Sequence, residues 1–191
     1  GPDPAPLAAA LPVPVRAGLE RTLNLLVTGI GGMGVTTVGA VLAVAAHLDG
    51  LNTLTLDMTG LAQKGGPVTS FVRFAPGGTA IEGPRVPTAA LDVLIASDML
   101  VAAGAETLTV MSRARTATVA NARVAPTAEF VLRQVQSFEA ARLSRTLAEA
   151  SRDYAEFNAA GLAEKLFGDA IYANMMLVGA ALQKGLLPVS L

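Results

Sequence analysis

Short apolar runs alternate with longer segments of helical character along most of the chain. Runs of about five apolar residues, bounded by glycine or polar positions, are typical of buried strands, and periodic segments of about 12 to 15 residues are typical of the helices between them. The expected strands are 24–28, 53–56, 68–74, 92–96, 117–121 and 155–158, and the expected helices are 35–48, 98–111, 138–151 and 170–184. This alternation predicts an α/β domain with a doubly wound, mainly parallel sheet in a Rossmann-like three-layer arrangement.

The first 22 residues differ in composition from the rest of the chain. Five of the eleven prolines fall among the first fourteen residues, interleaved with alanine. Such a segment favours an extended conformation. We therefore expect residues 1–22 to form a linker or arm and residues 23–191 to form one domain.

Composition narrows the classes of function. Fourteen Lys and Arg balance fifteen Asp and Glu, which leaves no excess of positive charge to attract nucleic acid. The chain has no cysteine, so it can form no disulfide and hold no iron–sulfur cluster through thiolates. His47 is the single histidine and has no second imidazole with which to share a metal ion, so we expect a structural role for it and no metal site.

The uncharged run 22–46 is long enough to raise the question of a membrane span. It contains Gly29, Gly31, Gly32, Gly34 and Gly39, which suit a tight turn between a strand and a helix better than a continuous helix in lipid. The sequence shows no pattern of a signal peptide. We expect no contact with a membrane and a cytoplasmic location.

A glycine-rich loop follows the first expected strand and opens the first expected helix. Gly29, Gly31, Gly32, Met33 and Gly34 belong to a GxGxxG pattern, in which glycines allow close approach of a ligand and the helix start offers N–H groups to a phosphate. The same stretch has the spacing of an ATPase phosphate loop but lacks its lysine, which argues against an ATPase.

Two further interpretations of this loop stay open. Asp57, at the end of the second expected strand, could bind a ribose, as in a dinucleotide-binding protein, or could bond the amides of its own loop. Alternatively, the glycines serve only close packing between strand and helix.

Four segments in a fixed order carry a resemblance to a known family. They are GIGGMGVTTVGAVLAVAAHLDG, LDMTGLAQKGGPVTSFVRFA, DVLIASD and GDAIYANMMLVGAALQKGLLP. Together they resemble the gamma domain of 2-oxoacid:ferredoxin oxidoreductases, and among these the indolepyruvate type. The likeness covers roughly residues 25–190, and its second segment is the most specific part.

The resemblance implies membership of a thiamine-diphosphate enzyme that oxidatively decarboxylates an aryl 2-oxoacid, transfers the acyl group to coenzyme A and reduces ferredoxin. Alpha- and beta-type domains or subunits would be the partners of this chain. They would carry the thiamine diphosphate and the iron–sulfur clusters, and ferredoxin would meet those other domains. The isolated chain would be inactive and would hold no catalytic residue. The alternatives are a free-standing NAD(P)- or nucleotide-binding domain and a purely structural module of the complex.

Within that resemblance, two loops are the candidates for binding. The loop 29–34 would bind a phosphate of coenzyme A or face the cofactor-bearing domains. The second loop consists of Gln63, Lys64, Gly65 and Gly66, with Arg73 at the end of the next strand to complete it. Lys64 and Arg73 serve equally well as surface charges or in internal ion pairs. Asn174 lies one turn from Ile171 in the last helix, so we expect its amide to face inward and to bind backbone, either in the domain core or at an interface.

Overall fold

The computed structural model describes residues 3, 5–60, 66–122 and 130–190. Within them, six strands form one sheet in the order β2-β3-β1-β4-β5-β6. The strands are β1 (Leu23–Ile30), β2 (Asn52–Thr59), β3 (Pro67–Ala75), β4 (Val93–Ala96), β5 (Ala117–Asn121) and β6 (Asp153–Phe157). The helices are α1 (Ala5–Ala9), α2 (Val35–Leu48), α3 (Met99–Ala102), α4 (Ala105–Val110), α5 (Phe130–Ala150), α6 (Ala159–Phe167), the 3-10 turn η1 (Ala170–Tyr172) and α7 (Ala173–Gln183).

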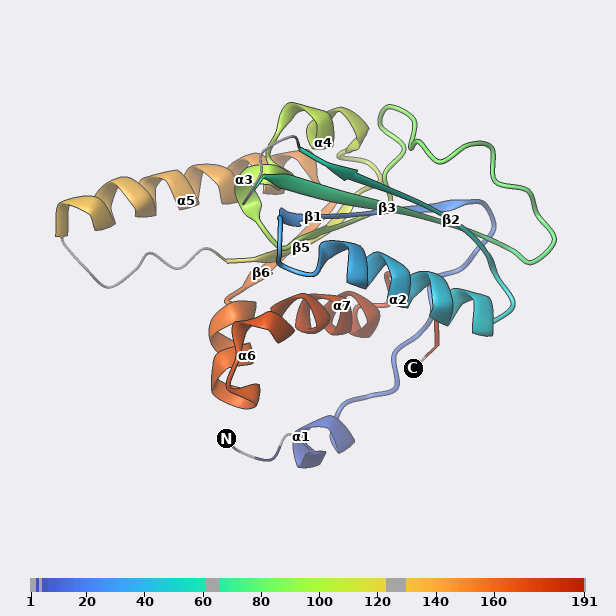
Figure 1. Cartoon of the computed structure of the whole chain (residues 1–191), viewed down its shortest axis with the longest axis horizontal. Coiled ribbons are helices and arrows are strands. Elements are labelled where there is room, and N and C mark those ends of the chain that lie inside the picture. Colours follow the sequence, from blue (N-terminus) through green and yellow to red (C-terminus); the bar gives the residue numbers. More distant parts are fainter. Residues whose placement is uncertain (1–2, 4, 61–65, 123–129, 191) are drawn as a thin grey trace.

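Helices cover both faces of the sheet, which confirms the doubly wound three-layer α/β fold. Figure 1 shows α2, α6 and α7 on one side of the sheet and α3, α4 and α5 on the other. Each layer has its own apolar core: Leu25, Val27 and Phe74 meet α2 and α7, whereas Leu26 and Leu94 meet α3 and α5. Alternate residues of β1 thus serve opposite cores, as expected for a strand buried on both faces.

The sheet is mixed rather than uniformly parallel. Strands β1, β4, β5 and β6 run parallel, whereas β3 is antiparallel to both of its neighbours, β1 and β2. Only residues 60–66 separate β2 from β3, and a parallel crossover requires a dozen or more residues. The short connection therefore forces an antiparallel pair and places β3 between β1 and β2.

Several expected boundaries change in the structure. The helix expected over 98–111 is divided into α3 and α4, because Gly104 has an extended backbone. The strands expected over 53–56 and 68–74 are both longer in the structure, so the connection between β2 and β3 is shorter than expected. Helix α5 begins at Phe130, earlier than expected, and α6 was not foreseen. The last helix starts with η1, whose first turn is capped by Asp169.

The last residues of the N-terminal arm contact the domain beside the end of α2 and the C-terminal segment. The short helix α1 lies within the arm, which is therefore not extended throughout. The N–H of Ala17 donates to the carbonyl of Leu187 at 2.9 Å, and Arg16 lies 3.6 Å from the carboxylate of Asp49. Ser190 donates hydrogen bonds to Asp49 through its N–H and its hydroxyl, and these bonds lower the pKa of the Asp49 carboxyl group.

Helix α2 packs closely on the sheet at Gly39. A Cβ atom at this position would collide with Oγ of Ser70, which donates a 2.6 Å hydrogen bond to Asp57. We expect Gly39→Ala to lower the free energy of unfolding by about 1–3 kcal/mol through overpacking. Adding Ser70→Ala removes the colliding atom, so the double variant should recover most of this loss. Denaturant unfolding of the two single variants and the double variant measures the coupling, and simple additivity of the two losses would contradict the packing argument.

Candidate functional site

The carboxyl ends of β1 and β4 meet at the point where the chain changes direction across the sheet. From β1 the chain passes through α2 toward the β2 edge, whereas from β4 it passes through α3 and α4 toward β5 and β6. Ligands of open α/β sheets bind preferentially at such a switch point. The glycine-rich segment 29–34 lies there: Gly29 and Ile30 end β1, which extends further than the sequence predicted, and residues 31–34 follow it.

Close packing and two left-handed residues shape the glycine loop. A Cβ atom on Gly29 would lie 2.5 Å from the side chain of Val35, so only glycine lets α2 start this close to the strand. Gly32 and Gly34 have φ values of 89° and 75°, in the region that side chains disfavour. Close packing and left-handed backbone therefore explain why glycine is needed at these positions. The loop presents backbone rather than side chains at the surface.

The start of α2 can receive an anion. The first N–H groups of an α-helix have no intrahelical acceptor, and Gly34 at the N-cap of α2 has no side chain to supply one; among the described residues no side-chain cap is seen there. Thr36 and Thr37 follow with exposed side chains. Free N–H groups and the positive end of the helix dipole favour a phosphate or carboxylate at this position. The N–H of Gly31 is already engaged, since it donates to the carbonyl of Gly66 at 2.8 Å.

Asn174 holds the loop from the neighbouring helix. The side chain of this residue is buried in α7, and its Nδ2 donates to the carbonyl oxygen of Met33. The inward orientation expected from the sequence is confirmed, and its partner is backbone of the glycine loop. Helix α7 thereby fixes the conformation in which the start of α2 is presented.

Three polar side chains at this edge were missed by the sequence reasoning. Ser97 directly follows β4, and its buried hydroxyl has no partner within the described residues; the same holds for Thr28 on β1. Asn121, at the end of β5, donates to the carbonyl of Ser97 at 3.4 Å and accepts from the N–H of Ala160 at 3.3 Å. Their position after successive buried strands is a signal that could have identified them.

The second candidate loop is only partly described. Gly66 contacts the glycine loop through its hydrogen bond to Gly31, so the two loops meet at the same edge of the sheet. Gln63, Lys64 and Gly65 lie outside the described residues. Their proposed part in binding stays a prediction.

Asp57 does not lie where a dinucleotide fold would need it. It is inside β2 rather than at its end, and it accepts the hydrogen bond from Ser70 on β3. Because β3 separates β2 from β1, Asp57 is two strands away from the strand that leads into the glycine loop. This arrangement differs from the neighbouring strands that bind a ribose in dinucleotide folds.

Arg73 lies at the opposite edge of the sheet from the glycine loop. Strand β3 is antiparallel to β1, so its end pairs with the beginning of β1, where Arg73 faces Asn24. Arg73 is 8% exposed as a whole residue. Its Nε donates to Asn24 Oδ1 at 2.9 Å, and its Nη1 donates to the carbonyls of Glu82 and Gly83 at 2.8 and 2.6 Å. The structure thus shows Arg73 fastening loop 76–92 and does not bring it to the candidate site.

The described residues contain no group of three His, Asp or Glu side chains placed to share a metal ion. His47 is exposed in the last turn of α2, where a cation is favourable. Across the same part of the chain, no helix combines the length and the hydrophobicity that a membrane span requires.

The fold and the site define an α/β domain that presents an uncapped glycine loop at the switch point of its sheet. The chain belongs to the pyruvate ferredoxin/flavodoxin oxidoreductase family, whose family model matches residues 24–191. The matched region begins one residue after the start of β1 and extends to the C-terminal residue.

Curated relatives carry one name. The chain is 28% identical over 178 residues to indolepyruvate oxidoreductase subunit IorB of Pyrococcus horikoshii, which covers 89% of this chain and 81% of that protein. It is 27% identical over 158 residues to the subunit of the same name from Methanothermobacter thermautotrophicus, covering 83% and 76%. For the Archaeoglobus fulgidus subunit, identity is 39% over 74 residues, which is 39% of this chain and 35% of that relative.

Solved structures share the fold. Pyruvate oxidoreductase subunit PORC of Thermotoga maritima has a TM-score of 0.55 and 18% identity, with 88% of this chain and 80% of that chain covered. The 2-oxoglutarate:ferredoxin oxidoreductase of Magnetococcus marinus, with 2-oxoglutarate, coenzyme A and succinyl-CoA bound, has a TM-score of 0.58 and 18% identity. There the match covers 85% of this chain but 24% of the other, so the shared fold is one part of a longer polypeptide.

Proposed function

We propose that this chain is the gamma-type domain of a thiamine-diphosphate-dependent 2-oxoacid:ferredoxin oxidoreductase of the indolepyruvate type. Its part would be to contribute to the coenzyme A site or to the inter-domain interface during oxidative decarboxylation to acyl-CoA. The observation that carries the proposal is the likeness to subunit IorB over 178 residues, nearly the whole domain. The uncapped start of α2 at the switch point supports the coenzyme A role.

The residues of the site suit a phosphate of coenzyme A. The N–H groups at the start of α2 would donate to phosphate oxygens, while Asn174 would keep the loop in place through Met33. Backbone donors fixed by a packed helix need no reorganisation when an anion binds. The position of Asp57, two strands from β1, makes an NAD(P)-binding domain the weaker alternative.

The chemistry of electron transfer would lie in other domains. Iron–sulfur clusters are held by cysteine thiolates, and this chain has no cysteine. Thiamine diphosphate and the clusters would therefore be carried by alpha- and beta-type partners, which ferredoxin would meet. The isolated chain would bind without turning over substrate.

An apolar outer surface supports an interface with such partners. We call the outer surface of α2, α6, η1 and α7 the helical face; its exposed apolar side chains are Val41, Val44, Leu48, Leu162, Phe167, Ile171, Tyr172 and Met175. Val44, Leu48 and Ile171 are 60%, 80% and 64% exposed. Extended apolar surface of this kind marks an interaction site. Met175, which is 44% exposed, belongs to this face.

Reconstitution tests the proposed function. The full chain is combined with the thiamine-diphosphate-bearing and cluster-bearing subunits encoded in the same genome, and ferredoxin reduction is followed with an aryl 2-oxoacid and coenzyme A. We expect turnover only when this chain is present, and none from this chain alone. Full turnover without the chain would contradict the proposal.

A charge on the helical face should weaken assembly. We expect Val44→Glu to lower the affinity for the partner subunits at least tenfold, because an unpaired carboxylate would be buried on association. Phe138→Glu is the matched control, since Phe138 is 75% exposed but belongs to α5 in the other helix layer. Co-purification and sedimentation of the mixed subunits measure the effect. Equal assembly of both variants would show that the helical face is not the interface.

A further inference from the structure

Strand β2 forms one edge of the sheet and is long and regular. In the described part of the chain its one strand neighbour is β3, and all eight of its residues pair with β3 without a bulge, from Asn52 opposite Ala75 to Thr59 opposite Val68. The other side of β2 therefore offers a row of backbone N–H and C=O groups. Such a row is a template for a further strand.

The usual protection of an edge strand is missing from β2. Its sequence NTLTLDMT has no proline, no lysine and no arginine, and the pairing with β3 shows no irregularity that would twist the edge away. Asp57 is its single charged residue, and its carboxylate is held by the hydroxyl of Ser70. Natural proteins usually shorten, charge, bulge or cover such an edge, and an edge without these features is a ready template for pairing with another chain.

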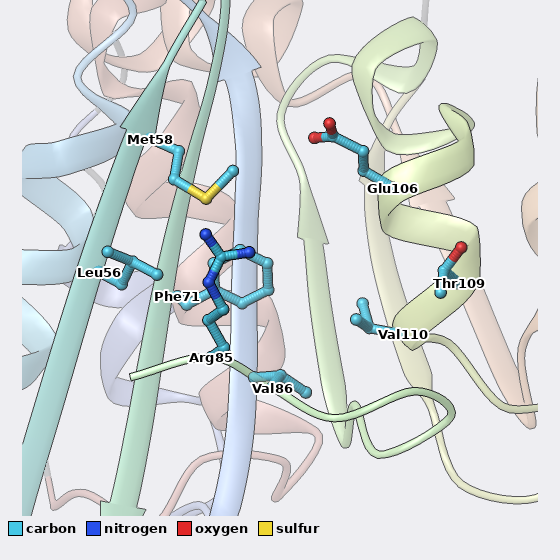
Figure 2. Close-up of a pocket in the computed structure, with 8 residues that line it drawn as sticks. All are labelled: Leu56, Met58, Phe71, Arg85, Val86, Glu106, Thr109 and Val110. Carbon is cyan, nitrogen blue, oxygen red and sulfur yellow. The ribbon is translucent and has the colours of Figure 1, made fainter. Parts of the chain in front are cut away.

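One face of β2 is apolar and borders a cavity. Leu54, Leu56 and Met58 follow Asn52 on this face, and the residues that alternate with them, three threonines and Asp57, lie on the side of α2. Figure 2 shows Leu56 and Met58 on the outermost strand of the cavity wall, with α4 on the opposite side. The cavity of about 310 Å³ is lined by Leu56, Met58, Phe71, Arg85, Val86, Glu106, Thr109 and Val110. Here the helices of the α3, α4 and α5 layer leave apolar sheet surface uncovered.

We propose that β2 pairs antiparallel with β2 of a second copy of this chain, with Leu56 opposite Leu56 at a two-fold axis. A two-fold axis perpendicular to the sheet keeps the apolar faces of both copies on the same side. Leu54 then lies opposite Met58 of the second copy, Thr53 opposite Thr59, and Thr55 opposite Asp57. The two six-stranded sheets become one continuous sheet.

The residues of β2 select this register. Centring the axis on Asp57 would put two carboxylates directly opposite one another, and centring it on Thr55 would put Asn52 opposite Met58. With Leu56 at the centre, the three apolar residues face one another and no like charges are directly opposed. The added strand also extends the apolar floor next to each cavity. Pairing at this edge leaves the helical face free, so it is compatible with partner subunits and does not depend on them.

A single engineered cysteine tests the register, because the chain has no cysteine of its own. Directly opposed Cα atoms in an antiparallel pair are about 4.5–5.5 Å apart, which is within the range for a disulfide. We expect Leu56→Cys in the full chain to give a covalent dimer on mild oxidation. Leu54→Cys is the control on the same face, since the two copies of residue 54 would be about 13 Å apart along the strands. The double variant Leu54→Cys/Met58→Cys should again give a dimer.

Charge variants test the same pairing without oxidation. Leu56→Lys places two like charges opposite each other and should shift sedimentation of the chain from dimer to monomer. Thr55→Lys places its ammonium opposite Asp57 of the second copy and should leave the dimer intact. A monomeric wild-type chain, or equal cross-linking at positions 54 and 56, would overturn the proposal. Protection of the β2 amides from hydrogen exchange only after a different subunit is added would also overturn it.

Discussion

Asp92→Ala should lower the free energy of unfolding by about 3 kcal/mol, the largest stability effect expected of a single substitution. Asp92 is 12% exposed and accepts hydrogen bonds from Arg115 at 2.7 and 3.1 Å and from Arg21 at 2.8 and 3.2 Å. It also accepts from the N–H of Asn24 at 2.8 Å. Alanine would leave these donors without their acceptor at the amino edge of β1, β4 and β5. Thermal and denaturant unfolding measure the loss.

The pKa of Asp92 gives this stabilisation a pH dependence. Burial raises the pKa of this carboxyl group, but the bonds from Arg115, Arg21 and Asn24 outweigh burial and hold the pKa below its ordinary value. A carboxyl group with a lowered pKa in the folded state stabilises above its unfolded pKa, about 3.9, and loses this effect as the pH falls through the folded pKa. We therefore expect the difference in stability between wild type and Asp92→Ala to be full at neutral pH and to shrink in acid below about pH 4.

Asp153→Ala is the matched control for Asp92. Asp153 also forms an ion pair, 3.1 Å from Lys184, but its side chain is 45% exposed. An exposed pair of this kind contributes less than about 1 kcal/mol. Two results would contradict the stabilising role of ionised Asp92. One is an equal loss of stability in the two variants, and the other is a stability difference for Asp92→Ala that does not change with pH.

Gly34→Val should raise the KM for coenzyme A at least tenfold in the assembled enzyme, with little change in the KM for the 2-oxoacid. Gly34 has a φ of 75° at the start of α2, a conformation that a β-branched residue strongly disfavours. The loop would relax and turn the N–H groups away from the phosphate. A tenfold change corresponds to about 1.4 kcal/mol, which is within the strain expected for this backbone.

Gly34→Asn distinguishes the effect of backbone strain from the effect of simply adding a side chain at this position. Asparagine tolerates the left-handed conformation far better than a β-branched residue does, so the backbone of the loop should keep its course. We expect this variant to fold and assemble normally and to retain much more coenzyme A affinity than Gly34→Val. If Gly34→Val assembles normally and its KM for coenzyme A is unchanged, the glycine loop does not bind coenzyme A.

The hydrophobic pattern predicts most of the fold because each core strand is buried on both faces. The apolar runs at β1, β4 and β5 and the periodic segment at α2 were found close to their observed bounds. The glycine loop could be predicted as well, since its glycines reflect local needs: close approach of α2 and left-handed backbone. Asn174 was identified by its helical spacing alone.

The features that the hydrophobic pattern did not predict depend on contacts between residues far apart in the sequence. The direction of β3 depends on the short 60–66 connection, and this direction carries Arg73 to the edge opposite the glycine loop. The partners of Arg73 include carbonyls about ten residues away in an irregular loop, which no periodicity reveals. The positions of Ser97 and Asn121 depend on the order of strands across the sheet.

Titration calorimetry of the full chain tests most directly whether the glycine loop is a coenzyme A site. Coenzyme A, NAD+ and NADPH are titrated separately into wild type and into Gly34→Val. We expect heat of binding from coenzyme A, none from NAD+ or NADPH, and a much weaker response to coenzyme A in the variant. Binding of NAD+ or NADPH without binding of coenzyme A would contradict the account and would favour a dinucleotide-binding domain. No binding of coenzyme A at millimolar concentrations would contradict it as well.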